Sequence, residues 1–410
     1  MSQKNNVLIF SDVPTPSYER PYRWVLFVDY LIDKLDKIFV VSSFSSKKFR
    51  TENDNSNIVR YYYSKNYDFK KNQYNIINRM MSIWLLFIHL CIFFLRNKKI
   101  DFIRSGSTYL SFLLSIVDKR HIYIADICDF YFDLYSEFNM PFSKYLKKII
   151  FYFEKIWIKR ANLLFVDTLA QRRFMVNKMW IDWKKCVVIP NWVIIDYFPK
   201  TKEKDTEIMW QYGLEMNDKI IFYGWDISYM DWIENLIKYV AESHSHKIKL
   251  LIIGKWNESY INNLKNQIQN WKLERNIIVD FFKPYDQLYR YLSIADICVA
   301  PFKINFTSNT VECGKIITYL LSWRHILSTF ADWVYSLYWD HIQYFKDWDY
   351  DDMKNKIDTL LQRELLDWFD NRRYLWEKFD FRKIILYEYD VINNYIHNPD
   401  QDFTKYDYIY

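Results

Sequence analysis

The feature that most limits the possible folds is a strand, turn and helix pattern over residues 219–241. An apolar run over residues 220–223 ends at Gly224, a polar turn follows, and apolar residues return at helical spacing from Ile233 onward. This pattern is the first step of a βα nucleotide-binding unit. The turn follows the carboxyl end of the strand, where open α/β sheets bind their ligands. Because the amides of a first helical turn can bind an anion, the pattern predicts a phosphate site here.

A turn of this kind favours glycine, because the backbone bends sharply and approaches the phosphate closely. In this chain Trp225 and Trp232 stand at the two ends of the turn instead. The conflict is general, since the 410 residues include 5 Gly and 17 Trp, whereas a usual glycine share of about 7% predicts about 29. Asn-Gly and Asp-Gly are the strongest turn dipeptides, and this chain has Asn-Trp and Asp-Trp in comparable places.

We therefore expect most of these tryptophans to be glycines in the living protein, encoded by UGA codons that some bacterial lineages read as glycine. The alternative is a tryptophan-rich protein whose indoles fill a core or bind sugars. Nine residues in turn contexts are the glycine candidates: Trp180, Trp183, Trp192, Trp225, Trp232, Trp256, Trp323, Trp333 and Trp348. The other eight are undecided: Trp24, Trp84, Trp157, Trp210, Trp271, Trp339, Trp368 and Trp376.

Length and composition set the class of protein. A chain of 410 residues that is 50% apolar can bury two cores, so two domains are expected. A net charge of +6 favours anionic small molecules or a membrane surface. It does not indicate nucleic-acid binding, because no Lys/Arg stripe alternates with aromatic residues. The five scattered cysteines are typical of buried thiols in a reducing compartment. Since no signal peptide precedes the first strand, we expect a cytoplasmic protein.

The same strand and helix rhythm runs through both halves of the chain. We predict an α/β protein with an N-terminal Rossmann-like domain over residues 1–195 and a second over residues 196–375. A charged stretch at residues 200–205 has the composition of a linker. Residues 376–397 are predicted to be a closing helix that packs back on the first domain, and the polar tail at 398–410 is predicted to be frayed.

Several stretches of the first half could serve a ligand or a membrane. Arg20 and Arg23, in the loop after the first strand, could bind phosphate or be solvated. Residues 83–95 are apolar but too short to span a bilayer, so a buried helix or an interfacial one is expected. Residues 143–160 form a basic amphipathic helix that could lie on an anionic membrane or simply be solvated. Asp126 and Asp129 follow a strand, where turn capping is favoured over metal binding.

Five motifs in order resemble the GT-B glycosyltransferases, specifically the family 4 and family 1-like bacterial enzymes. They are Ile189-Pro190-Asn191-Trp192-Val193, Tyr223-Gly224-Trp225, Leu251-Ile252-Ile253-Gly254-Lys255-Trp256, Ala295-Asp296-Ile297-Cys298-Val299-Ala300-Pro301-Phe302 and Lys315-Ile316-Ile317-Thr318-Tyr319-Leu320-Leu321-Ser322-Trp323. The match becomes closer at residues 192, 256 and 323 if these are glycines. The resemblance implies two Rossmann-like domains facing across a cleft.

The resemblance also implies a function. A nucleoside-diphosphate sugar would bind the second domain and a polysaccharide or lipid-linked acceptor the first. The sugar would be transferred with retention of configuration, without a metal or another cofactor, in the cytoplasm or at the inner face of the membrane. The implied donor-binding residues are Gly224, Trp225, Lys255, Phe282, Lys283, Pro284, Lys315 and Thr318. The acceptor-side residues are Arg20, Arg23 and Arg104.

The chain departs from the family pattern at several positions. Thr318 replaces a glutamate that often binds the ribose hydroxyls, and Asp231 replaces a basic residue. No histidine of catalytic type follows Arg104, so the catalytic residue is unknown and Glu312 is the one candidate, against a plain surface acid. Asp347 and Asp349 have the spacing of a metal-binding pair but the surroundings of a surface turn. The alternatives are therefore an inactive sugar-nucleotide binder and a sugar-nucleotide 2-epimerase of the same fold.

Overall fold

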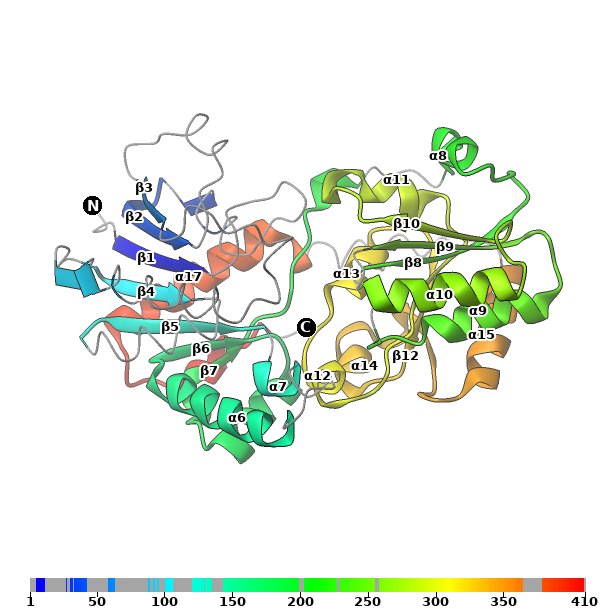
Figure 1. Cartoon of the computed structure of the whole chain (residues 1–410). Helices are drawn as coiled ribbons and strands as arrows, with labels where there is room; N and C mark the ends of the chain where they lie inside the picture. Colours follow the sequence, from blue (N-terminus) through cyan, green and yellow to red (C-terminus); the bar gives the residue numbers. More distant parts are fainter. Residues whose placement is uncertain are drawn as a thin grey trace. The chain divides into compact units, whose positions relative to one another are not determined.

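The computed structural model describes only part of the chain. The described residues are 5–11, 27, 30–31, 33–42, 58–62, 88, 91–92, 94–95, 100–105, 120–128, 130–134, 143–198, 203–225, 227, 229–254, 258–363 and 378–408. The chain divides into two compact units: unit 1 is Met1–Pro190 with Arg382–Ile409, and unit 2 is Asn191–Phe381 with Tyr410 (Figure 1). The predicted domain limit at residue 195 lies just inside unit 2.

Unit 1 is built on a parallel sheet of seven strands with the order β3-β2-β1-β4-β5-β6-β7. The strands are β1 (Asn5–Ser11), β2 (Leu35–Ser42), β3 (Ile58–Tyr62), β4 (Phe102–Ser105), β5 (Ile122–Ile127), β6 (Leu163–Val166) and β7 (Cys186–Val188). The order reverses between β1 and β4, as in a Rossmann fold. The described residues of β4 and β6 are all buried, as in a parallel sheet covered on both faces.

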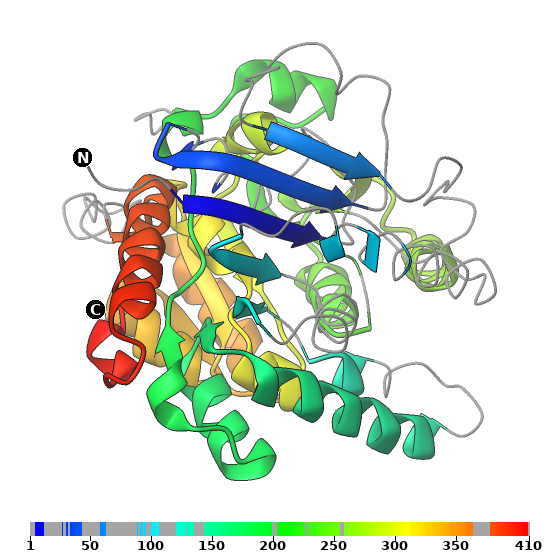
Figure 2. The same ribbon diagram turned by 90° about the vertical axis from the view of Figure 1, so that its left-hand side faces the viewer.

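The described helices of unit 1 come from both ends of the chain. They are α5 (Tyr131–Leu134), α6 (Ser143–Arg160), α7 (Leu169–Phe174), the π-helix η3 (Met175–Met179), the 3-10 helix η4 (Trp183–Lys185) and α17 (Phe381–His397). Figure 2 shows α17 beside the strands of this unit. A buried ion pair of 2.8 Å joins Arg104 of β4 to Glu388 of α17, and it ties the last long helix to the sheet.

The tail after α17 is ordered, so the prediction of a frayed end is wrong over the described residues. A 3-10 helix, η8 (Phe403–Tyr406), buries Phe403 almost completely. Asp407 then forms an ion pair of 2.6 Å with Arg172 and accepts a hydrogen bond from the Val188 amide. Polar composition misled the prediction, because one buried aromatic ring and one paired carboxylate are enough to hold this segment against the sheet.

Unit 2 has a second parallel sheet with the order β10-β9-β8-β11-β12-β13. Its strands are β8 (Lys219–Gly224), β9 (Ile248–Gly254), β10 (Ile277–Phe281), β11 (Ile297–Ala300), β12 (His325–Thr329) and β13 (Gln343–Phe345). Its α-helices are α8 (Thr206–Gln211), α9 (Ile233–Ser243), α10 (Glu258–Asn270), α11 (Leu288–Ser293), α12 (Phe306–Thr310), α13 (Gly314–Leu320), α14 (Asp332–Tyr338) and α15 (Tyr350–Gln362). Its 3-10 helices are η5 (Ile195–Tyr197), η6 (Tyr285–Gln287) and η7 (Trp339–His341).

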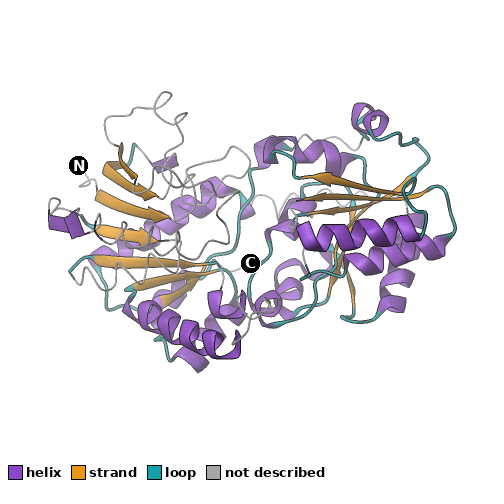
Figure 3. Ribbon diagram, viewed as in Figure 1, coloured by secondary structure: helices purple, strands orange, loops and turns teal. Residues whose placement is uncertain are grey.

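The main core of unit 2 lies between its sheet and three helices. Apolar residues of α9, α10 and α15 pack in one cluster with the residues of β8, β9 and β11 that point to the same face, including Ile221, Leu250 and Val299. Figure 3 shows these helices against the strands. The α13 helix packs through Tyr319, whose ring lies 6.0 Å from that of Phe222. Phe222 neighbours Ile221 in β8, so its side chain points to the opposite face of the sheet.

The structure differs from the sequence analysis at three further points. Short strands β3 and β13 were not predicted, because neither has a clear alternating pattern. The apolar stretch at residues 83–95 was expected to be a buried or an interfacial helix, and among its described residues Phe94 is buried whereas Ile88, Ile92 and Leu95 are exposed. Lys204 of the expected linker forms an ion pair with Asp296, which fixes the end of that stretch to unit 2.

Candidate functional site

The candidate site in unit 2 lies where the strand order of the sheet reverses. β8 pairs with β9 on one side and with β11 on the other, so the chain leaves β8 and β11 in opposite directions at their carboxyl ends. The segments that follow the two strands are joined by backbone hydrogen bonds, from Trp232 N–H to Pro301 C=O at 2.7 Å and from Lys303 N–H to Met230 C=O at 2.9 Å. Such a switch point is where open α/β sheets bind ligands.

The β8 turn is held by a side chain of α13. The Tyr319 hydroxyl donates to the Gly224 carbonyl at 2.9 Å and accepts from the Gly224 amide at 2.8 Å. Burial raises the pKa of Tyr319 well above its ordinary value, so the hydroxyl keeps the proton that it donates. Both polar groups of the last residue of β8 are thereby satisfied, which fixes the turn where the sequence predicted a phosphate site.

A buried ion pair lies beside this turn. The Lys315 ammonium is 2.8 Å from the Asp231 carboxylate, and the two side chains are 2% and 5% exposed. The second Asp231 oxygen accepts from the Tyr223 hydroxyl at 2.7 Å, and the ammonium lies 4.7 Å from the centre of the Phe302 ring. The charge of Lys315, one of the implied donor-binding residues, is thus balanced inside unit 2 by Asp231, which stands where the family has a basic residue.

Trp225 packs against two glycines. A Cβ atom added at Gly254 would lie 1.6 Å from the Trp225 carbonyl oxygen, so only glycine fits at residue 254. The far edge of the Trp225 indole lies 3.2 Å from the position that a Cβ atom would take at Gly314, the first residue of α13. The indole therefore covers the start of α13, the helix that carries the implied donor-binding residues Lys315 and Thr318.

Three of the implied donor-binding residues, Phe282, Lys283 and Pro284, follow β10, and a fourth, Thr318, lies in α13. Lys283 is paired with Asp280 at 2.8 Å, and Pro284 precedes the 3-10 helix η6. The Thr318 hydroxyl donates to the Gly314 carbonyl at 2.8 Å. Burial raises the pKa of Tyr285, in η6, to about 12, against the lowering effect of its hydrogen bond with Thr318. That contact brings the segment after β10 and the α13 helix together, as the predicted donor site requires. Phe282, in the same segment, is half-buried.

Glu312, the catalytic candidate, is engaged by its own unit. Its carboxylate accepts from the Asn191 amide at 2.7 Å and from the Tyr338 hydroxyl at 2.9 Å, and its side chain is buried. These contacts fix the turn that follows Pro190. Asp347 and Asp349 likewise bind backbone amides, those of Ile304 and Asp352, which is how carboxylates act in a surface turn.

Lys303 is a cation at the switch point that the sequence analysis did not single out. It lies three residues after the end of β11, and its ammonium lies 4.6 Å from the centre of the Trp232 ring. Among the described residues it has no carboxylate partner. Its place three residues after the predicted strand end at Ala300 was the signal that could have identified it.

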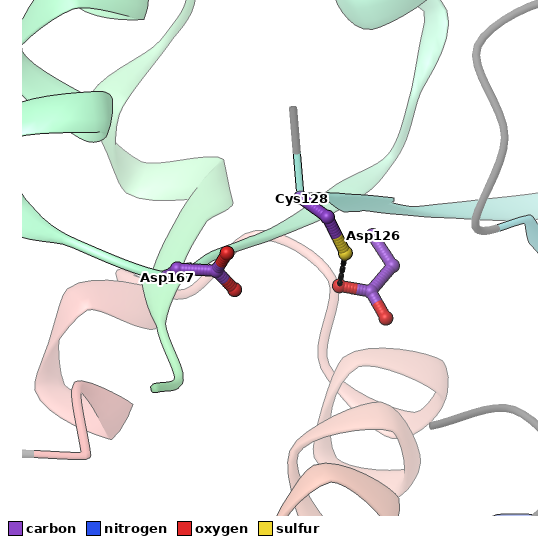
Figure 4. Close-up of side chains that lie close together, drawn as sticks. All are labelled: Asp126, Cys128 and Asp167. Carbon is purple, nitrogen blue, oxygen red and sulfur yellow. Dashed lines mark hydrogen bonds between the residues drawn. The ribbon is translucent and has the colours of Figure 1, made fainter. Parts of the chain in front are cut away.

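A second group of polar side chains lies at the carboxyl ends of β5 and β6 in unit 1. Oxygen and sulfur atoms of Asp126, Cys128 and Asp167 lie within 4.8 Å of one another (Figure 4). Asp126 is also paired with Arg104 at 3.0 Å, and this guanidinium would repel a cation bound there. We therefore interpret the group as part of the ion network that holds α17. Cys128 is exposed, contrary to the expectation of buried thiols.

Arg104 is used within unit 1, where it is 1% exposed and lies over the ring of Phe27 at 4.4 Å. Of the other predicted site residues, Arg20 and Arg23 lie outside the described residues, as does Lys255.

Comparisons with known proteins agree with this architecture. Residues 204–304, which run from before α8 to just past β11, match the family profile of glycosyl transferases group 1. No curated protein matches the chain by sequence.

Solved structures match almost the whole chain. The Anabaena protein Alr3699/HepE in complex with UDP matches with a TM-score of 0.69 at 13% identity, over 95% of this chain and 100% of that one. A Rickettsia africae glycosyltransferase gives 0.67 at 17% identity, over 97% and 100%. Sucrose-phosphate synthase from Thermosynechococcus elongatus gives 0.72 at 10% identity, over 96% and 99%. The chain therefore has the GT-B fold, and residues 204–304 of its second unit match the group 1 glycosyl transferases.

Proposed function

We propose that this protein transfers a sugar from a nucleoside-diphosphate sugar to a polysaccharide or lipid-linked acceptor, with retention of configuration and without a metal ion. The observation that carries the donor part is the switch point between β8 and β11, which the group 1 match spans. Gly224, Thr318 and the segment after β10 surround it, and Alr3699/HepE, which has the same fold, is described in complexes with UDP and UDP-glucose. Stabilisation of the departing diphosphate would be the main catalytic contribution.

The first experiment measures donor use. Nucleoside-diphosphate sugars that differ in base and sugar are incubated with the protein and a lipid-linked acceptor, and free nucleoside diphosphate is quantified with and without EDTA. We expect acceptor-dependent release from one donor, unchanged by EDTA, and an NMR spectrum of the product in which the anomeric configuration of the donor is retained. Loss of activity in EDTA would exclude the metal-free mechanism, and an inverted product would exclude retention.

Two alternatives give different results in the same assay. An inactive binder would bind a nucleoside diphosphate in calorimetry without any turnover. The Lys315–Asp231 pair is the observation behind this alternative, because a neutralised Lys315 has no net charge with which to stabilise a departing diphosphate. A 2-epimerase would convert the nucleotide sugar into its C2 epimer without an acceptor and without net release of nucleoside diphosphate.

We further propose that the protein works at the inner face of a membrane, with α6 lying on anionic lipid. None of the helices that the structure describes is long and apolar enough to cross a membrane. The α6 helix instead has exposed apolar side chains at helical spacing, namely Tyr145, Ile149, Tyr152 and Ile156. Exposed Lys148, Lys159 and Arg160 lie on the same helix. Apolar residues beside cations are typical of interfacial helices, and each cation near an anionic surface contributes about 1 kcal/mol.

Vesicle flotation tests this partner. We expect binding to vesicles of phosphatidylglycerol and phosphatidylcholine, weaker binding to phosphatidylcholine alone, and loss of binding in the double variant Ile149→Ser, Ile156→Ser. Exposed Met216 in unit 2 provides the control Met216→Ser. Equal flotation of the parent and of the double variant would contradict a role for α6.

A further inference from the structure

Tryptophan occupies a backbone conformation that favours glycine at three places. Among the described residues, five that are not glycine have positive φ: Trp180 (58°), His244 (48°), Lys272 (56°), Trp339 (41°) and Trp348 (63°). Three of the five are tryptophan, although Tyr and Phe together are far more numerous in the chain and neither appears in this group. A bulky residue with positive φ is a genuine outlier, and aromatic bulk by itself does not explain why, of Trp, Tyr and Phe, tryptophan alone shows it among the described residues.

Each of the three positions has a local reason to need glycine. Trp180 ends the helical segment η3 in the left-handed conformation, the usual place of a C-terminal glycine. Trp348 is the third residue of a β-turn that the Asp349 amide closes on the Lys346 carbonyl, where type II and type I′ turns require positive φ. Trp339 has φ 41° and ψ −127°, close to the first central residue of a type II′ turn, which glycine dominates.

The side chains at these positions are mostly exposed, and their contacts are few: the Lys155 ammonium lies over the Trp180 ring, Trp339 Nε1 donates to the Ser336 carbonyl, and the Trp348 ring packs on that of Trp232. The indoles of Trp180, Trp339 and Trp348 are 73%, 61% and 72% exposed. A tryptophan that is kept for its packing is normally mostly buried. Backbone geometry and exposure therefore agree that the fold uses these positions for their φ angle and not for an indole.

We infer that residues 180, 339 and 348 are glycines in the natural protein, and that the same substitution at residues 225 and 232 opens the nucleoside-diphosphate site. The first part stands on backbone geometry alone, and it extends to Trp339, which sequence reasoning left undecided. The second part rests on the proposed donor function. UGA codons read as glycine account for both parts through one cause.

The consequence for the site follows from two contacts. The Trp225 indole covers Gly314 at the start of α13. The Trp232 indole lies between the Lys303 ammonium and the Trp348 ring, whose centre is 4.1 Å away, and its Nε1 donates to Asp347 at 3.0 Å. Without these indoles, the space at the start of α13 is clear and Lys303 is freed from an aromatic face. A diphosphate could then meet a cation that Asp231 does not neutralise. Trp232 is also the N-cap of α9, a position that glycine suits better than tryptophan.

The gene gives the first test. We expect UGA at codons 180, 225, 232, 339 and 348, and UGG at these positions would overturn the inference.

Thermal unfolding of variants tests the backbone argument separately. At residues 180, 339 and 348, the Trp→Gly variant should melt above the Trp→Ala variant by about 2–4 °C, because only alanine keeps the Cβ strain at positive φ. Trp210 is the matched control, since it is equally exposed but lies in the α8 helix without positive φ. There Trp210→Ala should melt above Trp210→Gly. If the melting temperatures of the Gly and Ala variants fall in the same order at residues 180, 210, 339 and 348, the inference is contradicted.

Calorimetry with UDP tests the donor part. The double variant Trp225→Gly, Trp232→Gly should bind UDP at least about tenfold more tightly than the chain with both indoles. Suppose that Trp→Gly melts above Trp→Ala at residues 180, 339 and 348, but that the double variant binds UDP no more tightly than the chain with both indoles. This result would refute the opened site and leave the glycine assignment intact. No binding of UDP, GDP or ADP by any variant, together with no turnover, would refute the proposed donor function instead.

Discussion

Removing the carboxylate of the buried Lys315–Asp231 pair should destabilise unit 2 strongly. In Asp231→Asn the side chain keeps its size and can still accept from the Tyr223 hydroxyl. The Lys315 ammonium, whose side chain is 2% exposed, loses the one carboxylate with which it pairs among the described residues, 2.8 Å away. Breaking one partner of a buried pair costs about 3–5 kcal/mol, because the remaining charge is left without compensation. For a unit of this size that corresponds to a melting temperature lower by about 6–20 °C.

Urea unfolding at neutral pH measures the effect, with hydrogen exchange at the amides of β8 to confirm that unit 2 is the part affected. The double variant Asp231→Asn, Lys315→Met should regain much of the loss, because no buried charge remains. Glu242→Gln is the matched control, since Glu242 pairs with Lys354 on the surface, where both side chains are 37% exposed. If Asp231→Asn lowers the free energy of unfolding in urea by no more than Glu242→Gln does, the reasoning that the Lys315–Asp231 pair is isolated from solvent is refuted.

Three further predictions concern the β8 turn, the loss of stability at low pH and the tail after α17. Tyr319→Phe should cost about 1–3 kcal/mol in urea unfolding, because the buried amide and carbonyl of Gly224 lose their partner; an unchanged midpoint would mean that water replaces the hydroxyl. The hydrogen bond from Arg290 lowers the pKa of Asp205, so its stabilisation is present above the ordinary value of about 3.9 and is lost as the pH falls through the lowered folded-state pKa. Asp205→Asn should therefore differ from the parent at neutral pH and converge with it in strong acid, as followed by circular dichroism. Phe403→Ala should cost about 3–5 kcal/mol in urea unfolding if the tail is part of unit 1, and nothing if it is frayed.

The position of the candidate site was readable because it depends on local order. The run of apolar residues ending at Gly224 and the run ending at Ala300 each identify a parallel strand, and ligands bind at the carboxyl ends of such strands. Motif order along the chain then gave the fold, which the whole-chain structural matches confirm.

The partners of the site residues could not be read in this way. Lys315 and Asp231 are 84 positions apart, and nothing in the sequence near either one shows that they neutralise each other. The same holds for Glu312, which is held by Asn191 from 121 positions away. Pairing across such separations is decided by which strands become neighbours in the sheet, and this is a property of the closed structure.

By itself, the sequence determined two parallel α/β sheets, the edge of the second sheet at which a ligand is expected, and the conflict between tryptophan and the turns. These follow from residue spacing and from the conformations that single residues allow, both of which are local. Only the tertiary structure decided that Asp231 neutralises Lys315, that the tail is bound through Asp407, and that Trp339 has the positive φ that favours glycine. Burial, charge pairing and backbone angles depend on contacts between distant segments, which exist only once the chain is folded.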